Sequence, residues 1–491
     1  MRGGQEGCAG GGRADVRAAS RADVPAERVS GLTIGSIVDA CLRARPAGAA
    51  ATLGSERWTF ADLDAAANSC AHALRARGVG RGDIVAWRAD PSLATLSGFL
   101  ACARLGAIFA PLNPALTPDE TAGLLDYLSP RLVTGGDLDD GPGARIEPSA
   151  DDRSPHVVYL TSGSTGRPKG VLVSHRASWL RAAPGGGTFT HGLRGEGGVV
   201  TAFPLYHYGG WHYVLEAWQN RRPIHLVRRA AAGELAGAVE QWRASALYAI
   251  PAVWERVLAA DGDLSSLRHA DTGTSHAPAD LLGRIRDRVP GASTTVLYGS
   301  TEAGRMAALQ DWEISERPGS VGRAAFPGAL WLDGGEVCFA SPALMDGYYR
   351  LGPETEAVLR DGVYRSGDTG ELDEEGYLYL TGRTSELIRT GGESVWPAEV
   401  EAALRGLDGV ADLAVVGVPD ETWGEIVCAA IVPADGRVPD LEFLRRHLDG
   451  RLAGFKHPRR VVVVTEIPRT PATGQVQRRR LGERVARSSS S

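Results

Sequence analysis

The chain has 491 residues, of which 43% are hydrophobic and 23% are charged, as expected of a soluble globular protein with a large core. At roughly 150 residues per domain, this length predicts two to four compact units. The formal net charge is −6, without a long block of one sign. This argues against a general nucleic-acid binder, which needs a basic face for phosphates.

The first residues predict no targeting segment. Residues 1–30 are rich in Gly, Ala, Arg and Asp and lack the apolar stretch of a signal peptide, so we expect a disordered leader. The longest apolar stretch, 96–112, is broken by Arg104 and Gly106, so no membrane span is predicted. The six cysteines are dispersed without CxxC spacing. They indicate a reduced, cytoplasmic protein in which each is a buried small side chain.

Helix and strand patterns alternate from Gly31 to about Gly136. Thr59 is placed to cap a helix from Phe60 toward Leu74, and the following elements are a strand at 83–87, a helix at 93–104 and a strand at 107–111. This alternation predicts a largely parallel sheet covered by helices. Residues 137–154 are rich in Gly, Pro and Asp and predict a surface connection before the patterns resume at His156.

A second unit is predicted near the C-terminus. Residues 371–380 indicate two short strands around a turn at 374–376. After Gly382-Arg383 we expect a helix at 398–404, a strand at 413–418, a helix at 440–452 and a strand at 460–464. The chain therefore divides into the leader, a large domain at 31–383, a small C-terminal domain at 384–484 and a tail at 485–491, whose last four residues, all serine, are expected to be frayed.

The strongest local motif is Tyr159-Leu-Thr-Ser-Gly-Ser-Thr-Gly-Arg-Pro-Lys-Gly170. A strand at 156–160 leads into hydroxyl and glycine residues, whose backbone N–H groups and side chains suit phosphate oxygens. The motif ends in Lys169, one of only two lysines among 53 basic residues; the other is Lys456. An ordinary Gly/Ser surface loop is the alternative. The rarity of lysine in this chain favours phosphate binding.

Two further motifs place acidic residues beside glycines. Val296-Leu-Tyr-Gly-Ser-Thr-Glu-Ala-Gly304 offers Tyr298 for stacking on a base and Glu302 for Mg²⁺. Tyr364-Arg-Ser-Gly-Asp-Thr-Gly370 offers Asp368 to ribose hydroxyls, and Arg383 follows as a donor to ribose or phosphate. A solvated turn and a structural aspartate are the alternatives for the two motifs.

Taken in this order, the three motifs resemble the adenylate-forming superfamily, which contains acyl-CoA synthetases, luciferases and peptide-synthetase adenylation domains. The resemblance runs from about residue 31 to 484 and includes Gly335-Glu336, Gly347-Tyr348 and the segment Gly391 to Glu399. It implies an α/β fold with a large N-terminal domain and a small, mobile α+β C-terminal domain that rotates between two half-reactions. ATP and Mg²⁺ are the implied co-substrate and cofactor, with CoA as a possible acceptor.

The resemblance also implies roles for individual residues. Glu302 is the expected metal ligand, and His207, Thr301, Glu302, Lys169 and Gln475 occupy catalytic positions. The expected nucleotide contacts are Thr161, Ser162, Gly163, Ser164, Thr165, Gly166, Lys169, Ala277, Tyr298, Gly299, Ser300, Thr301, Asp368 and Arg383. The expected acid pocket contains His207, Tyr208, Gly209, Trp254, Ser275, His276 and Arg305.

The sequence departs from the family pattern at three places. Gln475 stands where the family usually has a lysine that bridges the acid and the α-phosphate, and Arg478 or Lys456 is a candidate to compensate. Ser385 occupies the hinge position, commonly Asp or Lys. In the acid pocket, His276 replaces a glycine and Arg305 a small residue, while Tyr208, Trp211, His212 and Trp254 lie nearby. A core position is the alternative for both tryptophans.

These features favour an AMP-forming ligase that adenylates a small or polar acid and transfers it to a thiol, most simply CoA, or to an amine. A carrier protein would have to act in trans. One alternative is a diazotase-like enzyme that activates nitrite, an inorganic oxyanion, and directs it onto an aromatic amine. Another is a catalytically weakened nucleotide-binding relative, because Gln475 brings no charge to the transition state. No nucleic-acid or membrane partner is expected.

Overall fold

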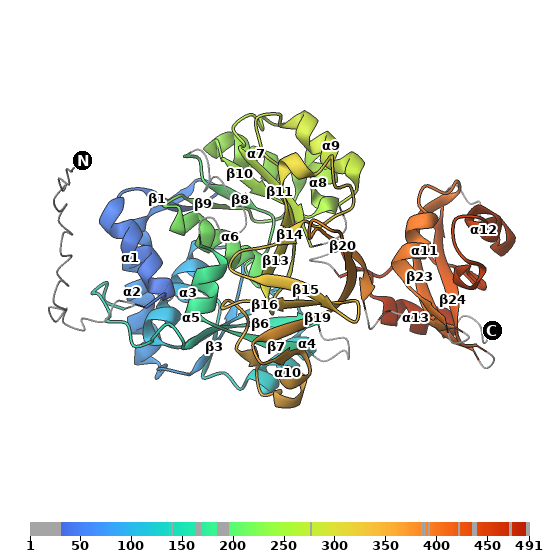
Figure 1. Cartoon of the computed structure of the whole chain (residues 1–491). Helices are drawn as coiled ribbons and strands as arrows, with labels where there is room; N and C mark the ends of the chain where they lie inside the picture. Colours follow the sequence, from blue (N-terminus) through green and yellow to red (C-terminus); the bar gives the residue numbers. More distant parts are fainter. Residues whose placement is uncertain are drawn as a thin grey trace, which may run out of the picture.

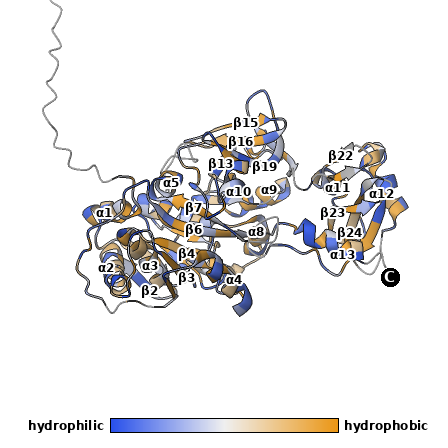
Figure 2. Cartoon of the chain, turned by 90° about the horizontal axis from the view of Figure 1, so that it is seen from below, coloured by the Kyte–Doolittle hydropathy of each residue, from blue (hydrophilic) through white to orange (hydrophobic). Residues whose placement is uncertain are grey.

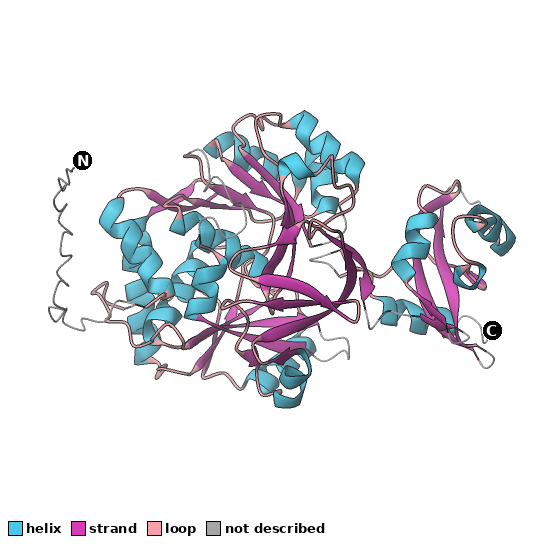
Figure 3. Ribbon diagram, viewed as in Figure 1, coloured by secondary structure: helices cyan, strands magenta, loops and turns pink. Residues whose placement is uncertain are grey.

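The computed structural model describes residues 31–487 apart from 137, 139–140, 163–167, 184–195, 275–276, 384–385, 387, 391–392, 421–422, 435–438 and 471–473 (Figure 1). The predicted leader, residues 1–30, therefore lies outside the described residues. A large α/β unit carries the N-terminal sequence, and a smaller α+β unit lies beside it beyond β20 (Leu378–Arg383) (Figures 1 and 3). This matches the predicted fold class. No helix in the described ranges is long and apolar enough to cross a membrane.

The first sheet of the large unit has the strand order β17-β7-β6-β4-β3-β5. Its strands are β3 (Ile84–Arg88), β4 (Ile108–Leu112), β5 (Leu132–Thr134), β6 (Pro155–Ser162), β7 (Pro168–Ser174) and β17 (Gly347–Tyr348). The helices α2 (Phe60–Ala76), α3 (Leu93–Leu105) and α4 (Pro118–Leu128) alternate with them. Strands β3 to β6 run parallel, as the alternation predicts.

A nine-stranded sheet follows, in the order β14-β13-β12-β11-β10-β8-β9-β1-β2. It contains β1 (Ala49–Leu53), β2 (Glu56–Thr59), β8 (Val199–Thr201), β9 (Ile224–Leu226), β10 (Ala246–Tyr248), β11 (His269–Gly273), β12 (Val296–Ser300), β13 (Gly304–Leu309) and β14 (Arg323–Ala324). The remaining helices of the large unit are α1 (Ile34–Ala44), α5 (His175–Arg181), α6 (Tyr208–Gln219), α7 (Ala232–Trp242), α8 (Pro251–Leu258), α9 (Ala279–Arg288) and α10 (Gly352–Val358).

A third sheet connects the large unit to the small one. It contains β15 (Ala329–Asp333), β16 (Glu336–Ala340), β18 (Leu359–Arg360), β19 (Val363–Leu372) and β20. The small unit pairs β21 (Ile388–Thr390), β22 (Glu393–Val395), β23 (Val410–Asp420), β24 (Gly424–Pro433) and β25 (Arg460–Val463). Its helices are α11 (Pro397–Ala403), α12 (Leu441–Leu448) and α13 (Arg478–Arg487).

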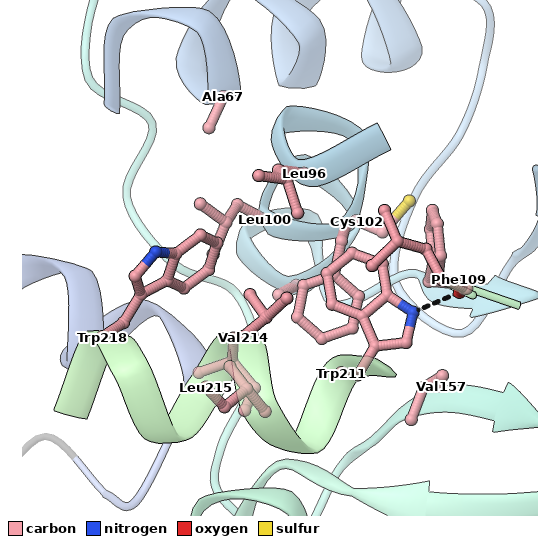
Figure 4. Close-up of a cluster of buried hydrophobic side chains, with 14 of the residues drawn as sticks. Ala67, Leu96, Leu100, Cys102, Phe109, Val157, Trp211, Val214, Leu215 and Trp218 are labelled. Carbon is pink, nitrogen blue, oxygen red and sulfur yellow. Dashed lines mark hydrogen bonds between the residues drawn. The ribbon is translucent and has the colours of Figure 1, made fainter. Parts of the chain in front are cut away.

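The main core lies between α6, α3 and the strands beneath them. Trp211 is fully buried and stacks on Phe99 with ring centroids 3.8 Å apart, while Trp218 packs further along the same helix (Figure 4). The strands at the centre of the first sheet are hydrophobic, whereas α4 and α13 carry many hydrophilic residues (Figure 2). The α/β layers therefore bury their shared faces and leave the helix exteriors to solvent.

Several predicted elements are confirmed and two boundaries are corrected. The hydroxyl of Thr59 accepts from the backbone N–H of Asp62, and the Asp62 carboxylate accepts from the Thr59 N–H, so the predicted cap is a complete capping box. Helix α12 ends at Leu448, earlier than predicted. The tail predicted from residue 485 is wrong, because α13 continues to Arg487 and buries Val485 beside β23. All described cysteines are buried and unpaired, as predicted; Cys8 lies outside the described residues.

Candidate functional site

The motif around Lys169 forms the hairpin of β6 and β7. Thr161 lies opposite Lys169 in this hairpin, and its hydroxyl donates to the Lys169 carbonyl at 3.3 Å. Strand β17 pairs with β7 and brings Tyr348 alongside, so that the Lys169 Nζ lies 4.8 Å from the centroid of the Tyr348 ring. Gly163, Ser164, Thr165 and Gly166 lie outside the described residues, and only the backbone of Ser162 is described.

Glu302 lies in the turn between β12 and β13, close to this hairpin. Its Oε1 accepts a hydrogen bond from the Tyr348 hydroxyl at 2.9 Å. Burial and the neighbouring Glu302 carboxylate raise the pKa of Tyr348, so this phenol remains protonated and acts as the donor. The tertiary fold therefore brings Lys169 and Glu302 to the same tyrosine, although 133 positions of sequence separate them. The positive charge of Lys169 suits a phosphate, and the negative charge of Glu302 suits a cation bound to that phosphate.

Arg181, at the end of α5, is a site residue that the motifs did not identify. Its guanidinium donates to the carbonyls of Ala343 at 2.7 Å, Thr301 at 2.9 Å and Glu302 at 2.7 Å. Only 7% of this residue is exposed. Arg181 therefore fixes the backbone of the turn that carries Thr301 and Glu302. In a chain with so many arginines, no sequence signal distinguishes this one.

The nucleoside motifs meet across two sheets. The Tyr298 hydroxyl on β12 donates to Asp368 Oδ2 on β19 at 2.7 Å. Asp368 lies opposite Arg383 in the β19–β20 pair, although only the backbone of Arg383 is described. Gly299 leaves no room for a side chain, since a Cβ there would lie 2.1 Å from the Gly304 carbonyl oxygen. The nearby Ser300 hydroxyl instead accepts from the Ala303 backbone N–H at 3.1 Å and so braces the same turn.

A cleft with a volume of about 2410 Å³ separates the two units. Tyr298, Asp368 and Ala277 line it on one side and Gln475 lines it on the other. Gln475 Nε2 donates to the Thr274 carbonyl at 3.3 Å, which joins the C-terminal loop to the end of β11. The residue predicted to face the acid and the α-phosphate is thus held against the large unit.

Neither predicted substitute for the missing lysine is placed to compensate. Lys456 Nζ lies 2.5 Å from Glu399 Oε2 within the small unit. Arg478 is mostly buried and donates to Glu386 Oε2 at 2.7 Å, and it also bonds Glu401. Both cations are therefore already paired with carboxylates. The hinge candidate, Ser385, lies outside the described residues.

The predicted acid pocket begins at the N-terminus of α6. His207 is the N-cap residue, and burial lowers its pKa to about 4, so the imidazole is neutral near pH 7. The Tyr208 ring packs against the Arg181 guanidinium at 5.0 Å. At Gly209, a Cβ would lie 3.0 Å from the Phe203 ring, so a larger residue would displace that ring.

Arg305 lies deeper, on β13. Its Nη2 is 2.7 Å from His212 Nε2 and 3.8 Å from Glu216 Oε1. Arg305 therefore lies among polar partners inside the large unit. The other members of the predicted pocket, Ser275 and His276, lie outside the described residues.

The two tryptophans named with this pocket belong to the core. Trp254 is fully buried in the second hydrophobic cluster, and its Nε1 donates to the Asp271 carbonyl at 2.9 Å. Trp211 is also fully buried and donates to the Leu205 carbonyl at 2.6 Å. Both indoles are satisfied internally, so the prediction that Trp254 lines the acid pocket is corrected to a core role.

Comparison with known proteins identifies relatives over almost the whole chain. The model of the AMP-binding enzyme family matches residues 39–144 and 129–349, and that of the AMP-binding enzyme C-terminal domain matches residues 399–473. An indoleacetate–CoA ligase of Aromatoleum aromaticum is 32% identical, with 87% of this chain and 93% of the relative covered. A feruloyl-CoA synthase of an Amycolatopsis species is 33% identical, with 89% and 97% covered.

A solved structure confirms the similarity of the fold. The crystal structure of ATP-bound MatB from Rhodopseudomonas palustris superposes with a TM-score of 0.82 at 25% identity. The superposition covers 92% of this chain and 99% of the MatB chain. The likeness therefore includes both units.

Proposed function

The chain belongs to the AMP-binding enzyme family and is an AMP-forming ligase of the acyl-CoA synthetase type, and we propose that it couples a small or polar carboxylic acid to the thiol of CoA. The observation that carries this proposal is the shared cleft. Tyr298 and Asp368 face it from the large unit and Gln475 faces it from the small unit. A nucleoside held by the first pair would therefore lie within reach of both units.

The first half-reaction forms a mixed anhydride. An oxygen of the substrate carboxylate attacks the α-phosphorus of ATP, and pyrophosphate leaves. Negative charge builds on the phosphate oxygens, so Lys169 contributes an electrostatic contact and Thr301 a hydrogen bond. Arg181 holds the turn that carries Thr301 and Glu302 in one position. In the second half-reaction the thiol sulfur attacks the acyl carbon and AMP leaves.

Glu302 is the residue that would hold Mg²⁺. Its Oε1 already accepts from Tyr348, so Oε2 remains for a cation that takes most of its other ligands from phosphate and water. In the described parts of the chain, no group of three or more His, Cys, Asp or Glu side chains is arranged to hold a metal ion. When bound, Mg²⁺ shields the charge of the phosphates.

Gln475 distinguishes this chain within the proposed reaction. Its amide donates to Thr274, so it serves as a neutral contact between the two units during adenylation. A neutral amide stabilises less developing charge than an ammonium group, which predicts slow acyl-adenylate formation. Lys456 and Arg478 do not make up the difference, because each is bound to glutamate.

An acid panel with Mg-ATP tests the proposal. AMP and pyrophosphate release would be followed with and without CoA, and an amine and a carrier protein added in trans would serve as alternative acceptors. CoA-dependent AMP release with a carboxylic acid supports the proposal. Release only with nitrite and an aromatic amine would replace the acid by an oxyanion, and ATP binding without any turnover would identify a silent relative.

A further inference from the structure

A polar face of α6 continues from the proposed acid pocket into the interior of the large unit. Tyr208, His212 and Glu216 follow each other at intervals of four residues and so share one side of the helix. The Tyr208 hydroxyl lies 3.4 Å from His212 Nδ1, and His212 Nε2 lies 2.7 Å from Arg305. The face thus leads from the helix N-terminus, where His207 lies, to a buried charge.

This charge has unused hydrogen-bonding capacity. Among the described residues, the Arg305 guanidinium has one hydrogen-bond partner, His212, although it carries five N–H donors. Glu216 is its nearest carboxylate at 3.8 Å, which is too long for a direct hydrogen bond. The side chains of Arg305 and Glu216 are 11% and 15% exposed, so neither is completely buried.

Two further polar atoms at this place are buried without a partner in the part of the chain that the structure describes. They are Asp271 Oδ1 at β11 and the Tyr213 hydroxyl on α6. Such groups cost free energy unless something binds to them. Aromatic rings surround them, because Tyr213 stacks on Tyr248 at 4.6 Å and Tyr248 stacks on Phe203 at 5.2 Å.

The charges of the cluster decide which ligand group it accepts. Glu216 already opposes Arg305, and Asp271 is a second carboxyl group whose pKa is raised to about 7 by burial and by Glu216. His212 stays neutral, since burial and Arg305 lower its pKa. A second carboxylate or another oxyanion would add a negative charge beside Glu216, which already balances the Arg305 guanidinium. A hydroxyl group would accept from Arg305 and donate to Glu216 at once.

We propose that the acid substrate is aromatic and carries a hydroxyl group distant from its reacting carboxyl, and that Arg305 and Glu216 bind this hydroxyl. This inference rests on the proposed function. The stacked rings of Tyr213, Tyr248 and Phe203 lie beside this cluster, so the surroundings of the bound hydroxyl are aromatic. The chain would then reject acids that lack the hydroxyl, because the cluster would remain unsatisfied.

The test compares 4-hydroxybenzoate and 4-hydroxycinnamate with benzoate, cinnamate and terephthalate. For each acid, kcat/KM for AMP release and the dissociation constant from calorimetry would be measured. We expect the hydroxylated acids to exceed their unsubstituted partners by about 10²-fold in kcat/KM. The charge-balanced variant Arg305→Met/Glu216→Met should bring this ratio to within about threefold of one, mainly through KM.

A matched control is the pair Arg104→Met/Asp64→Met, which removes a buried ion pair between α2 and α3. Its ratio should stay at the wild-type value. Equal or better use of the unsubstituted acids or of terephthalate would overturn the inference and leave the proposed function intact. Absence of turnover with every acid would overturn the proposed function. In that case the dissociation constants test the inference separately: it would be overturned if the hydroxylated acids bound no more tightly than the unsubstituted ones.

Discussion

Replacing Arg181 by lysine should slow adenylation without abolishing folding. Arg181 makes three hydrogen bonds to backbone carbonyls, and a compact ammonium group on a flexible stem cannot reproduce its planar fork. A charge-assisted hydrogen bond contributes about 1.5–3 kcal/mol. Losing two of three would cost about 3–6 kcal/mol. The Glu302 carbonyl keeps a second donor, the Met345 N–H at 2.8 Å, which lowers the expected loss to about 3 kcal/mol.

The effect on activity follows from the position of the turn. A displacement of about 1 Å in a reacting geometry can cost about 10²-fold, so we expect Arg181→Lys to lower kcat/KM for acyl-adenylate formation by that order. Pyrophosphate release under single-turnover conditions measures this step, and urea unfolding measures the stability. The second half-reaction, started from synthetic acyl-adenylate, should change less.

Arg365→Lys is the control for this prediction. Arg365 likewise makes several contacts, but with two carboxylates, Asp333 and Glu336, each at 2.7 Å, and its side chain on β19 is 39% exposed. Exposed ion pairs contribute about 0–1 kcal/mol, so this variant should remain close to wild type in both assays. Wild-type kcat/KM in Arg181→Lys would refute the assigned role of Arg181 as the residue that positions the turn.

Three further variants test the site and the fold. Glu302→Gln retains an acceptor for the Tyr348 hydroxyl, so the melting temperature should hold while Mg²⁺-dependent AMP release falls by about 10²-fold or more; normal turnover would disprove the site assignment. Gln475→Lys should raise the rate of acyl-adenylate formation by about tenfold in rapid-quench experiments, and an unchanged or lower rate would mean that the neutral amide suits this active site. Burial lowers the pKa of His225 to about 4, below its unfolded value of about 6.5, so the unfolded chain binds more protons between these pH values. The free energy of unfolding should therefore fall as the pH drops from 6.5 to 4, by up to about 1.4 kcal/mol per unit for this group, and His225→Gln should show a shallower slope in urea titrations.

Local sequence determined the elements and the order of the motifs. Thr59 and Asp62 are three residues apart, so their capping box depends on nothing distant, and the hydrophobic periodicity of the following helix is equally local. The same holds for the hairpin of β6 and β7 that contains Lys169, because its two strands are close neighbours in the sequence. These patterns predicted the α/β class and the nucleotide motifs because each is complete within a short window.

Only the tertiary structure decided which side chains share a site. Arg181 reaches Thr301 and Glu302 across some 120 positions, and nothing near it in the sequence marks that contact. The role of Trp254 depended on which side of its helix faced the core, and the partner of Arg305 depended on how β13 packs against α6. Pairings of this kind arise when elements that are distant in sequence pack together. The whole sequence specifies that packing, so no short segment of it reveals the pairing.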